Sequence, residues 1–399
     1  MKIAFDGQLL LEEKKTGIAW NAHHLILELA KDSENECVIQ CFTLCAAPET
    51  LDRLRVYQSA GCTVECNRRW KASWYKLLWM MVPIPYRFFF RSETDIAQFF
   101  NFTVPPGAKG KKVVFIHDMA YKSCPQTVSR KTRLWLELSM KKSCRHAGHI
   151  VTVSAFSKKE ISRYLHIPAK DITVVPNAVD HTVFHPGYSE GQIQQVLDKY
   201  GVEKEYLLYL GTIEPRKNLE RLIGAYSRLL REKKQLPQLV LAGKKGWLCD
   251  GIYQSVRNLH LENRILFTGY IEQADSPLLM CGAKVFIFPS LYEGFGMPPL
   301  EAMACGTPVI VSNTSALPEV VKDAGIAVDP ESEEELSEAV KRLLEDHKYR
   351  ESLSRLGIER AKKYTWANTA KMLMDVYKNV CRDQPEEGNQ MQVLKNDNR

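Results

Sequence analysis

Several features of membrane and metal proteins are missing from this sequence of 399 residues. No stretch gives 18 uninterrupted apolar residues, so we expect no transmembrane helix. The N-terminal stretch MKIAFDGQLLLEEKK lacks the basic n-region and the long apolar run of a signal peptide. None of the eleven cysteines belongs to a CxxC pair. We therefore expect a cytoplasmic protein with reduced thiols.

Three cysteines, Cys37, Cys41 and Cys45, are spaced four residues apart. On a helix this spacing would align three potential metal ligands. The segment CVIQCFTLC is rich in β-forming residues, however, and predicts a strand with buried thiols.

Acidic residues are absent from residues 67–91, although six cations and many aromatic residues lie there. Basic and aromatic residues together are typical of a membrane-surface segment. A helix with solvated cations and aromatics in the core has the same composition, and nucleic-acid binding is a third interpretation. The sequence leaves these three alternatives open. The cations are Arg68, Arg69, Lys71, Lys76, Arg87 and Arg91.

The hydrophobic content of 45% and the length indicate a globular protein with two domains. Short apolar strands such as KIAFDG and KKVVFIHDMA alternate with helical patterns. This alternation is interrupted by a connecting segment over residues 181–204 and resumes with the strand EYLLYLGTI. This alternation of strands and helices predicts two doubly wound α/β domains with parallel sheets. The expected boundaries are 1–185 and 186–365, followed by a helix over 366–383 that returns to the first domain and a disordered tail over 384–399.

The stretch SLYEGFGMPPLEAMACGTPVIVS, residues 290–312, places helix breakers between Glu293 and Glu301. Prolines suit the first turn of a helix, and glycines allow a ligand to approach the backbone. A helix N-terminus favours phosphate, and carboxylates accept hydrogen bonds from hydroxyls. The pattern therefore fits a nucleotide sugar, while a capped core helix with two solvated acids is the alternative.

Two cations, Arg216 and Lys217, follow the first strand of the second domain in the stretch YLGTIEPRKNLERLI. Ligands bind outside the carboxyl ends of strands in open parallel sheets. The pair therefore suits a diphosphate, although solvated loop charges would look the same.

The sequence resembles the large retaining glycosyltransferase family four, which has two Rossmann-like domains in the B-type fold. The resemblance rests on TGIAW, HD, EPRKN and the two glutamates of EGFGMPPLEAMACGTPV, in the family's order over about residues 1–380. It implies a metal-independent hexosyltransferase that retains anomeric configuration and uses a nucleotide diphosphate sugar without a cofactor. Among bacterial surface-polysaccharide enzymes of this kind, GDP-mannose is the favoured donor and a glycan or lipid-linked glycan is the acceptor.

The resemblance also implies roles for individual residues. Glu293 would contact the transferred sugar, Arg216 and Lys217 would neutralise the diphosphate, and His117 would lie near the reacting face of the sugar, unless it only satisfies backbone groups. Glu301 would hold the ribose. Further donor-binding positions are Gly17, Gly211, Thr212, Phe295, Gly296, Met297, Pro298 and Leu300.

Two departures from the family pattern concern the donor and acceptor sides of the site. Thr212 stands where many relatives have arginine, so Arg216 is expected to carry more of the charge. Ala19 and Trp20 replace residues of the common GIGRY motif, which leaves the acceptor side open. The alternatives are a nucleotide-sugar epimerase or hydrolase on the same fold, and a non-catalytic protein that binds a membrane surface.

Overall fold

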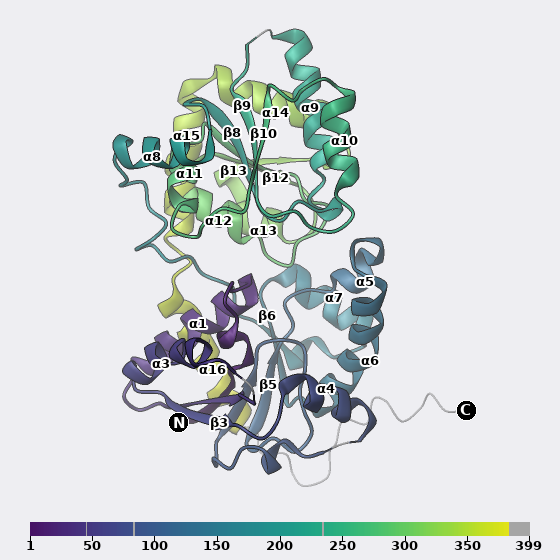
Figure 1. Cartoon of the computed structure of the whole chain (residues 1–399), viewed down its shortest axis with the longest axis vertical. Helices are drawn as coiled ribbons and strands as arrows, with labels where there is room; N and C mark the ends of the chain where they lie inside the picture. The colour runs from purple at the N-terminus through teal and green to yellow at the C-terminus, as the bar shows by residue number, and fades with distance from the viewer. Residues whose placement is uncertain (45, 83, 234, 383–399) are drawn as a thin grey trace, which may run out of the picture.

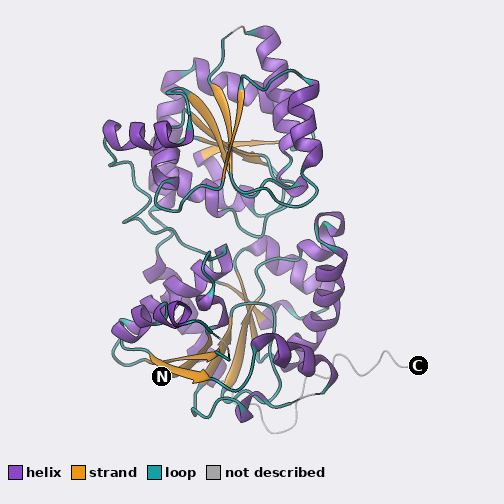
Figure 2. Ribbon diagram, in the orientation of Figure 1, coloured by secondary structure: helices purple, strands orange, loops and turns teal. Residues whose placement is uncertain are grey.

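The computed structural model describes residues 1–44, 46–82, 84–233 and 235–382. Two α/β domains follow each other along the chain, and Figure 1 shows them stacked along the long axis of the molecule. Each domain has one parallel sheet with helices on both faces, as Figure 2 shows. The predicted fold class is therefore confirmed. The expected disordered tail, 384–399, lies outside the described residues.

The first sheet has seven strands in the order β3-β2-β1-β4-β5-β6-β7. The order of its first six strands is that of a doubly wound dinucleotide-binding sheet, which reverses direction between β1 and β4. Side chains of β5 alternate between two buried clusters, with Val113 and Phe115 on one face and Val114 on the other. The strands are β1 (Lys2–Asp6), β2 (Glu36–Phe42), β3 (Thr63–Asn67), β4 (Ile96–Phe99), β5 (Lys111–Phe115), β6 (His149–Thr152) and β7 (Ile172–Val174).

Seven α-helices are described between the strands of the first domain. Thr16, Ser129 and Ser154 cap the N-termini of the three longest, α1, α6 and α7, with their side-chain oxygens. The helices are α1 (Gly17–Ala30), α2 (Pro48–Asp52), α3 (Arg55–Ser59), α4 (Ala72–Met81), α5 (Ala120–Ser123), α6 (Arg130–His146) and α7 (Ala155–Leu165).

The second sheet has six strands in the order β10-β9-β8-β11-β12-β13, which repeats the topology of the first. Its strands are β8 (Tyr206–Leu210), β9 (Gln238–Ala242), β10 (Ile265–Gly269), β11 (Val285–Phe288), β12 (Val309–Ser312) and β13 (Gly325–Val328). Its helices are α8 (Glu190–Tyr200), α9 (Leu219–Glu232), α10 (Asp250–Asn258), α11 (Ser276–Gly282), α12 (Met297–Ala304), α13 (Leu317–Val321), α14 (Glu333–Glu345) and α15 (His347–Ala361).

The last described helix, α16 (Trp366–Arg382), packs beside α1 of the first domain (Figure 1). The hydroxyl of Tyr377 donates a hydrogen bond to Oε1 of Gln98 on β4, at 2.9 Å. The chain thus crosses between the domains twice, once before α8 and once before α16.

The cysteine-rich segment forms β2, and Cys37 and Cys41 are buried on it, which confirms the strand interpretation. Cys45 lies outside the described residues. Within those residues, no helix combines the length and apolar character needed to cross a bilayer.

Candidate donor-binding site

The loop after β11 carries Glu293 and leads into α12. Gly296 occupies the N-cap of α12 with φ of 121°, a conformation that disfavours other residues. A Cβ at this position would also lie 2.7 Å from a methyl of Leu317. Pro298 and Pro299 fill the first turn, and no side chain caps the helix. The local sequence therefore builds a helix N-terminus with an open end.

Four charged side chains meet at this loop. Glu293 accepts a hydrogen bond from Nζ of Lys217 at 2.6 Å and pairs with Nη1 of Arg216 at 3.0 Å. The same guanidinium contacts Glu214 at 2.8 Å and donates to the carbonyl of Tyr292 at 2.7 Å. The structure thus brings the predicted catalytic residues Arg216, Lys217 and Glu293 into direct contact.

The charges in this cluster determine one another's ionisation. Burial by itself would raise the pKa of Glu293, but the Lys217 ammonium and the Arg216 guanidinium outweigh it and lower this pKa. Burial lowers the pKa of Lys217, and Glu293 offsets part of that effect. With Glu214, the cluster contains two cations and two carboxylates. An added diphosphate would therefore compete with carboxylates for the same two cations.

Adjacent strands place these residues next to each other. Arg216 and Lys217 follow β8, and Glu293 follows β11, its neighbour in the sheet. The N–H of Leu291 donates to the carbonyl of Arg216 at 2.9 Å and joins the two loops. The ammonium of Lys217 also lies 4.8 Å from the ring centre of Phe288. Sheet topology and backbone hydrogen bonds together fix the cluster at the carboxyl edge of the sheet.

The predicted Gly211, at the end of β8, lies against the backbone of Gly243. A Cβ at Gly243 would lie 1.8 Å from the carbonyl oxygen of Gly211, so a side chain there would require the backbone to move. The hydroxyl of Tyr209 donates to the carbonyl of Thr212 at 3.0 Å. Gly211 and Thr212 therefore lie in a tightly packed turn directly before the Arg216 loop.

Glu301 lies inside α12 and has a different environment. It is partly buried, and no hydrogen bond or ion pair to its carboxylate is found among the described residues. Burial raises its pKa to about 7. A carboxylate without protein partners is free to accept hydrogen bonds from ligand hydroxyls.

The remaining predicted residues of this segment differ in how they face solvent. Phe295 is buried against Tyr364, and Leu300 is fully buried in the hydrophobic core. Any ligand contact of these two residues would go through the backbone. Met297 and Pro298, at the start of α12, are partly exposed.

The first domain holds the Glu293 loop on both sides. Before Glu293, the hydroxyl of Tyr292 accepts a hydrogen bond from the N–H of Met119 at 2.9 Å. After Glu293, the carbonyl of Gly294 accepts hydrogen bonds from the hydroxyls of Ser154 at 2.7 Å and Ser157 at 3.1 Å. The position of Glu293 therefore depends on the contact between the domains.

Gly294 is required at this contact because a Cβ there would lie 2.5 Å from the carbonyl oxygen of His117. The loops of the two predicted catalytic residues thus touch. The ring of His117 is buried and its Nε2 lies 3.0 Å from the carbonyl oxygen of Phe100. Because a carbonyl only accepts, this bond places a proton on Nε2. Burial lowers the pKa of His117 and so favours the neutral ring, although the bond to Phe100 opposes this shift. The ring also stacks on Phe115 at 5.4 Å.

Gly17 begins α1 in the first domain, apart from the charged cluster. A Cβ at Gly17 would meet no atom within 4 Å, so the fold itself leaves space there. Nearby, the ammonium of Lys14 lies 4.6 Å from the ring centre of Tyr270 in the second domain. The loop before α1 therefore reaches across to the second domain.

Several residues of this site carried no role in the sequence analysis. Glu319 accepts hydrogen bonds from the first two N–H groups of α7 across the domain contact, at 2.8 and 3.2 Å. The N–H of Glu293 donates to the hydroxyl of Ser315 at 3.1 Å. Ser154 and Ser157, in the stretch VSAFSKKEI, supply the contacts to Gly294 from the first domain. These contacts join residues distant in the sequence, so local motifs do not reveal them.

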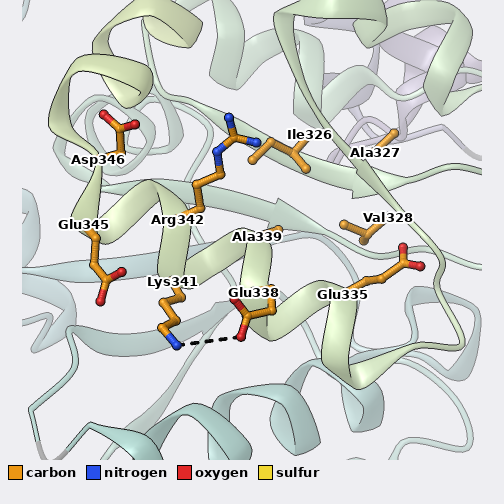
Figure 3. Close-up of a pocket in the computed structure, with 10 residues that line it drawn as sticks. All are labelled: Ile326, Ala327, Val328, Glu335, Glu338, Ala339, Lys341, Arg342, Glu345 and Asp346. Carbon is orange, nitrogen blue, oxygen red and sulfur yellow. Dashed lines mark ion pairs between the residues drawn. The ribbon is translucent and has the colours of Figure 1, made fainter.

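A separate hollow of about 530 Å³ lies between β13 and α14 (Figure 3). It is lined by both apolar and charged side chains, including Arg342 and an ion pair of Lys341 with Glu338 at 3.8 Å. None of the predicted site residues lines it, so it is not part of the candidate site.

In a comparison with known proteins, each half of the chain matches a glycosyltransferase family model. Residues 17–183 match the model of Glycosyltransferase Family 4, and residues 193–360 match that of Glycosyl transferases group 1. The O-antigen chain mannosyltransferase B of Escherichia coli is 37% identical over 279 residues, which cover 70% of this chain and 72% of the relative. A serotype-specific mannosyltransferase WbdA of Escherichia coli is 33% identical over 244 residues, but this chain spans only 30% of its length.

Solved structures show the same fold. The sucrose-phosphate synthase of Thermosynechococcus elongatus superposes with a TM-score of 0.74 at 19% identity, covering 96% of this chain and all of the other. Anabaena Alr3699/HepE, solved in complex with UDP and glucose, gives 0.70 at 18% identity, with 95% of this chain and 100% of the other covered.

Fold and site together define a two-domain glycosyltransferase of the B-type fold that uses a nucleotide-sugar donor. The chain belongs to glycosyltransferase family 4. The comparisons do not favour an epimerase, a hydrolase or a non-catalytic binding protein.

Proposed function

We propose that this protein transfers mannose from GDP-mannose, with retention of anomeric configuration and without a metal ion, to a glycan or lipid-linked glycan in polysaccharide biosynthesis. The names of the relatives support the sugar, since three of them are O-antigen or serotype-specific mannosyltransferases. The metal-free step is supported by Arg216 and Lys217, two cations placed where a diphosphate would bind.

The observation that carries this proposal is the pairing of both cations with Glu293. When the donor binds, its diphosphate takes over Arg216 and Lys217, and the carboxylate of Glu293 becomes available to the sugar hydroxyls. Glu293 thereby exchanges ion pairs for hydrogen bonds to the group that is transferred. Glu301, which has no protein partner among the described residues, accepts hydrogen bonds from the hydroxyls of the ribose.

The bond between C1 and the diphosphate oxygen then breaks while Arg216, Lys217 and the N-terminus of α12 stabilise the charge that develops. The sugar becomes oxocarbenium-like, and the acceptor attacks from the side on which the diphosphate leaves. The departing phosphate takes the acceptor's proton. The contact between the Glu293 and His117 loops keeps water away from the reacting carbon.

A screen of donors tests the assignment. The melting temperature of the purified protein is measured with GDP-, UDP- and ADP-sugars. Mannose transfer to a glycan that ends in mannose is then measured with and without chelator. We expect GDP-mannose to raise the melting temperature most, transfer to persist in chelator, and NMR to show the anomeric configuration of the donor in the product. Stabilisation by a UDP-sugar alone would overturn the sugar and nucleotide, and an inverted product would overturn the retaining step.

The proposed acceptor determines where in the cell the protein would act. A glycan on a lipid carrier would be met at the cytoplasmic face of the membrane, and the basic segment 67–91 of the first domain would approach the anionic lipid surface there. This enzyme would then act as a peripheral membrane protein.

A further inference from the structure

The aromatic residues of segment 67–91 divide into two sets. Tyr75, Trp79, Tyr86 and Phe90 are buried in the core of the first domain. Trp74, in contrast, is 52% exposed. The core interpretation of the sequence thus holds for part of the segment, and an apolar outer surface remains to be explained.

A second helix presents the same combination. On α6, Leu134 and Leu138 are 59% and 56% exposed, and Leu77 on α4 is 63% exposed. Leu134, Leu138, Lys141 and Arg145 follow one another at helical spacing and are all exposed, so they form one stripe along α6. An amphipathic helix with leucines and cations on its outer face is typical of membrane-surface helices.

The two helices adjoin each other. Nζ of Lys142 on α6 donates a hydrogen bond to the carbonyl of Trp79 on α4 at 2.6 Å and lies 5.0 Å from the centre of its ring. Figure 1 shows α4 and α6 on the same side of the first domain. Lys71 also lies over the ring of Trp74, at 5.5 Å. Apolar side chains and cations are therefore interleaved over both helices.

The charge of this region is strongly one-sided. Residues 67–91 carry six cations and no acid, and residues 130–146 carry six cations and one acid. That acid, Glu137, pairs with Lys122 at 3.2 Å and with Arg133 at 3.7 Å. The partner that fits is therefore anionic, and the exposed leucines and Trp74 require that it also accept apolar side chains. A bilayer with anionic headgroups meets both conditions.

We infer that α4 and α6 together form one docking surface for an anionic lipid bilayer, made of Trp74, Leu77, Leu134, Leu138, Lys141 and Arg145. This α4–α6 surface extends the basic segment onto a helix that the sequence did not single out. Its use for a lipid-linked acceptor rests on the proposed function, but the docking itself does not.

The α4–α6 surface is linked to the candidate site through α5. Lys122 at the end of α5 pairs with Glu137 of α6, and Met119, directly before α5, binds Tyr292 beside Glu293. A bilayer held against α6 would therefore lie next to the part of the first domain that completes the site.

Vesicle sedimentation tests the surface. Full-length protein is mixed with vesicles of phosphatidylcholine, alone or with phosphatidylglycerol, at low and high salt. The test variant carries Leu134→Ser, Leu138→Ser, Lys141→Ser and Arg145→Ser. The control variant makes the same exchanges at exposed residues of the second domain, Leu248→Ser, Leu356→Ser, Lys204→Ser and Arg355→Ser.

We expect wild type and control to bind anionic vesicles and to be released by salt, and neither to bind neutral vesicles. Each cation near an anionic surface is worth roughly fivefold in binding, so loss of Lys141 and Arg145 alone should weaken binding of the test variant by about 25-fold. Thermal melting and stabilisation by GDP verify that the variant is folded, and neither readout needs sugar transfer. Unchanged binding of the test variant, an equal loss in the control, or wild type that binds duplex DNA but no vesicles would each overturn the inference.

Discussion

Replacing Glu301 by glutamine should stabilise the protein at neutral pH while weakening donor binding. Burial raises the pKa of Glu301 to about 7 from its ordinary value of 4.5. The folded state therefore holds a proton between these pH values that the unfolded chain releases. Stability of the wild type must fall as pH rises from 4.5 through 7, because ionisation is opposed only in the folded state. Glutamine has no proton to lose and escapes this penalty.

The difference between a pKa of about 7 and 4.5 corresponds to roughly 3 kcal/mol. Glu301 is only partly buried, so solvent reduces the effect, and we expect a gain of about 1–3 kcal/mol for Glu301→Gln above pH 7. For a domain of this size that amounts to a rise of about 2–12 °C in melting temperature. At pH 4.5 the two proteins should melt together.

Thermal unfolding followed from pH 4.5 to 8 measures this effect. Glu262→Gln, the same exchange at an exposed glutamate without an ion pair among the described residues, serves as the matched control and should show no pH-dependent gain. Donor affinity of the wild type should increase with pH, whereas its stability decreases. If the ribose hydroxyls bind the ionised carboxylate as proposed, wild-type affinity for GDP should rise with pH through 7, and that of Glu301→Gln should stay low and flat. A stability difference that does not change with pH would refute the reasoning.

Four further substitutions and one treatment test the charged cluster and the domain contact. Arg216→Ala and Lys217→Ala should each lower turnover by about 10²-fold or more, measured in chelator, and magnesium should not restore it. Glu293→Gln removes the anion that competes with the diphosphate, so GDP should bind at least as tightly while kcat falls. Gly294→Ala should push the domains apart at His117 and lower kcat, with GDP binding unchanged in calorimetry. Tighter donor binding without loss of turnover in either of the last two variants would contradict the assigned geometry.

Much of the fold could be predicted because parallel sheets have continuous apolar strands. The first strand of the second domain, for example, was visible as the run EYLLYLGTI, which contains β8. The edge strand β3, Thr63–Asn67, was missed because its side chains are half-exposed and polar residues alternate along it. Helix α15, His347–Ala361, was missed as well. Few of its residues are buried, so its apolar periodicity is weak.

The candidate site was predicted as a set of residues but not as a set of contacts. The motif spacing marked Glu293, Arg216 and Lys217, yet nothing in it indicates that the glutamate pairs with both cations. Likewise, Ser157 and Gly294 lie 137 positions apart, and only the packing of two separately folded domains joins them. Such contacts depend on how the domains meet, which local patterns do not encode.

The way in which the domains meet bears on the chemistry of Glu293. Its carboxylate is held by cations of its own domain, whereas its backbone is flanked by residues that bind the other domain. If the domains separate, Tyr292 and Gly294 lose these partners, but the ion pairs to Arg216 and Lys217 persist. Under the proposed function, the cations would therefore bind a diphosphate even with the domains apart, and Glu293 would reach its final position only when the first domain contacts its loop. A donor bound without the first domain in place then lacks both a positioned Glu293 and protection from water, and this order of events favours transfer to the acceptor over hydrolysis.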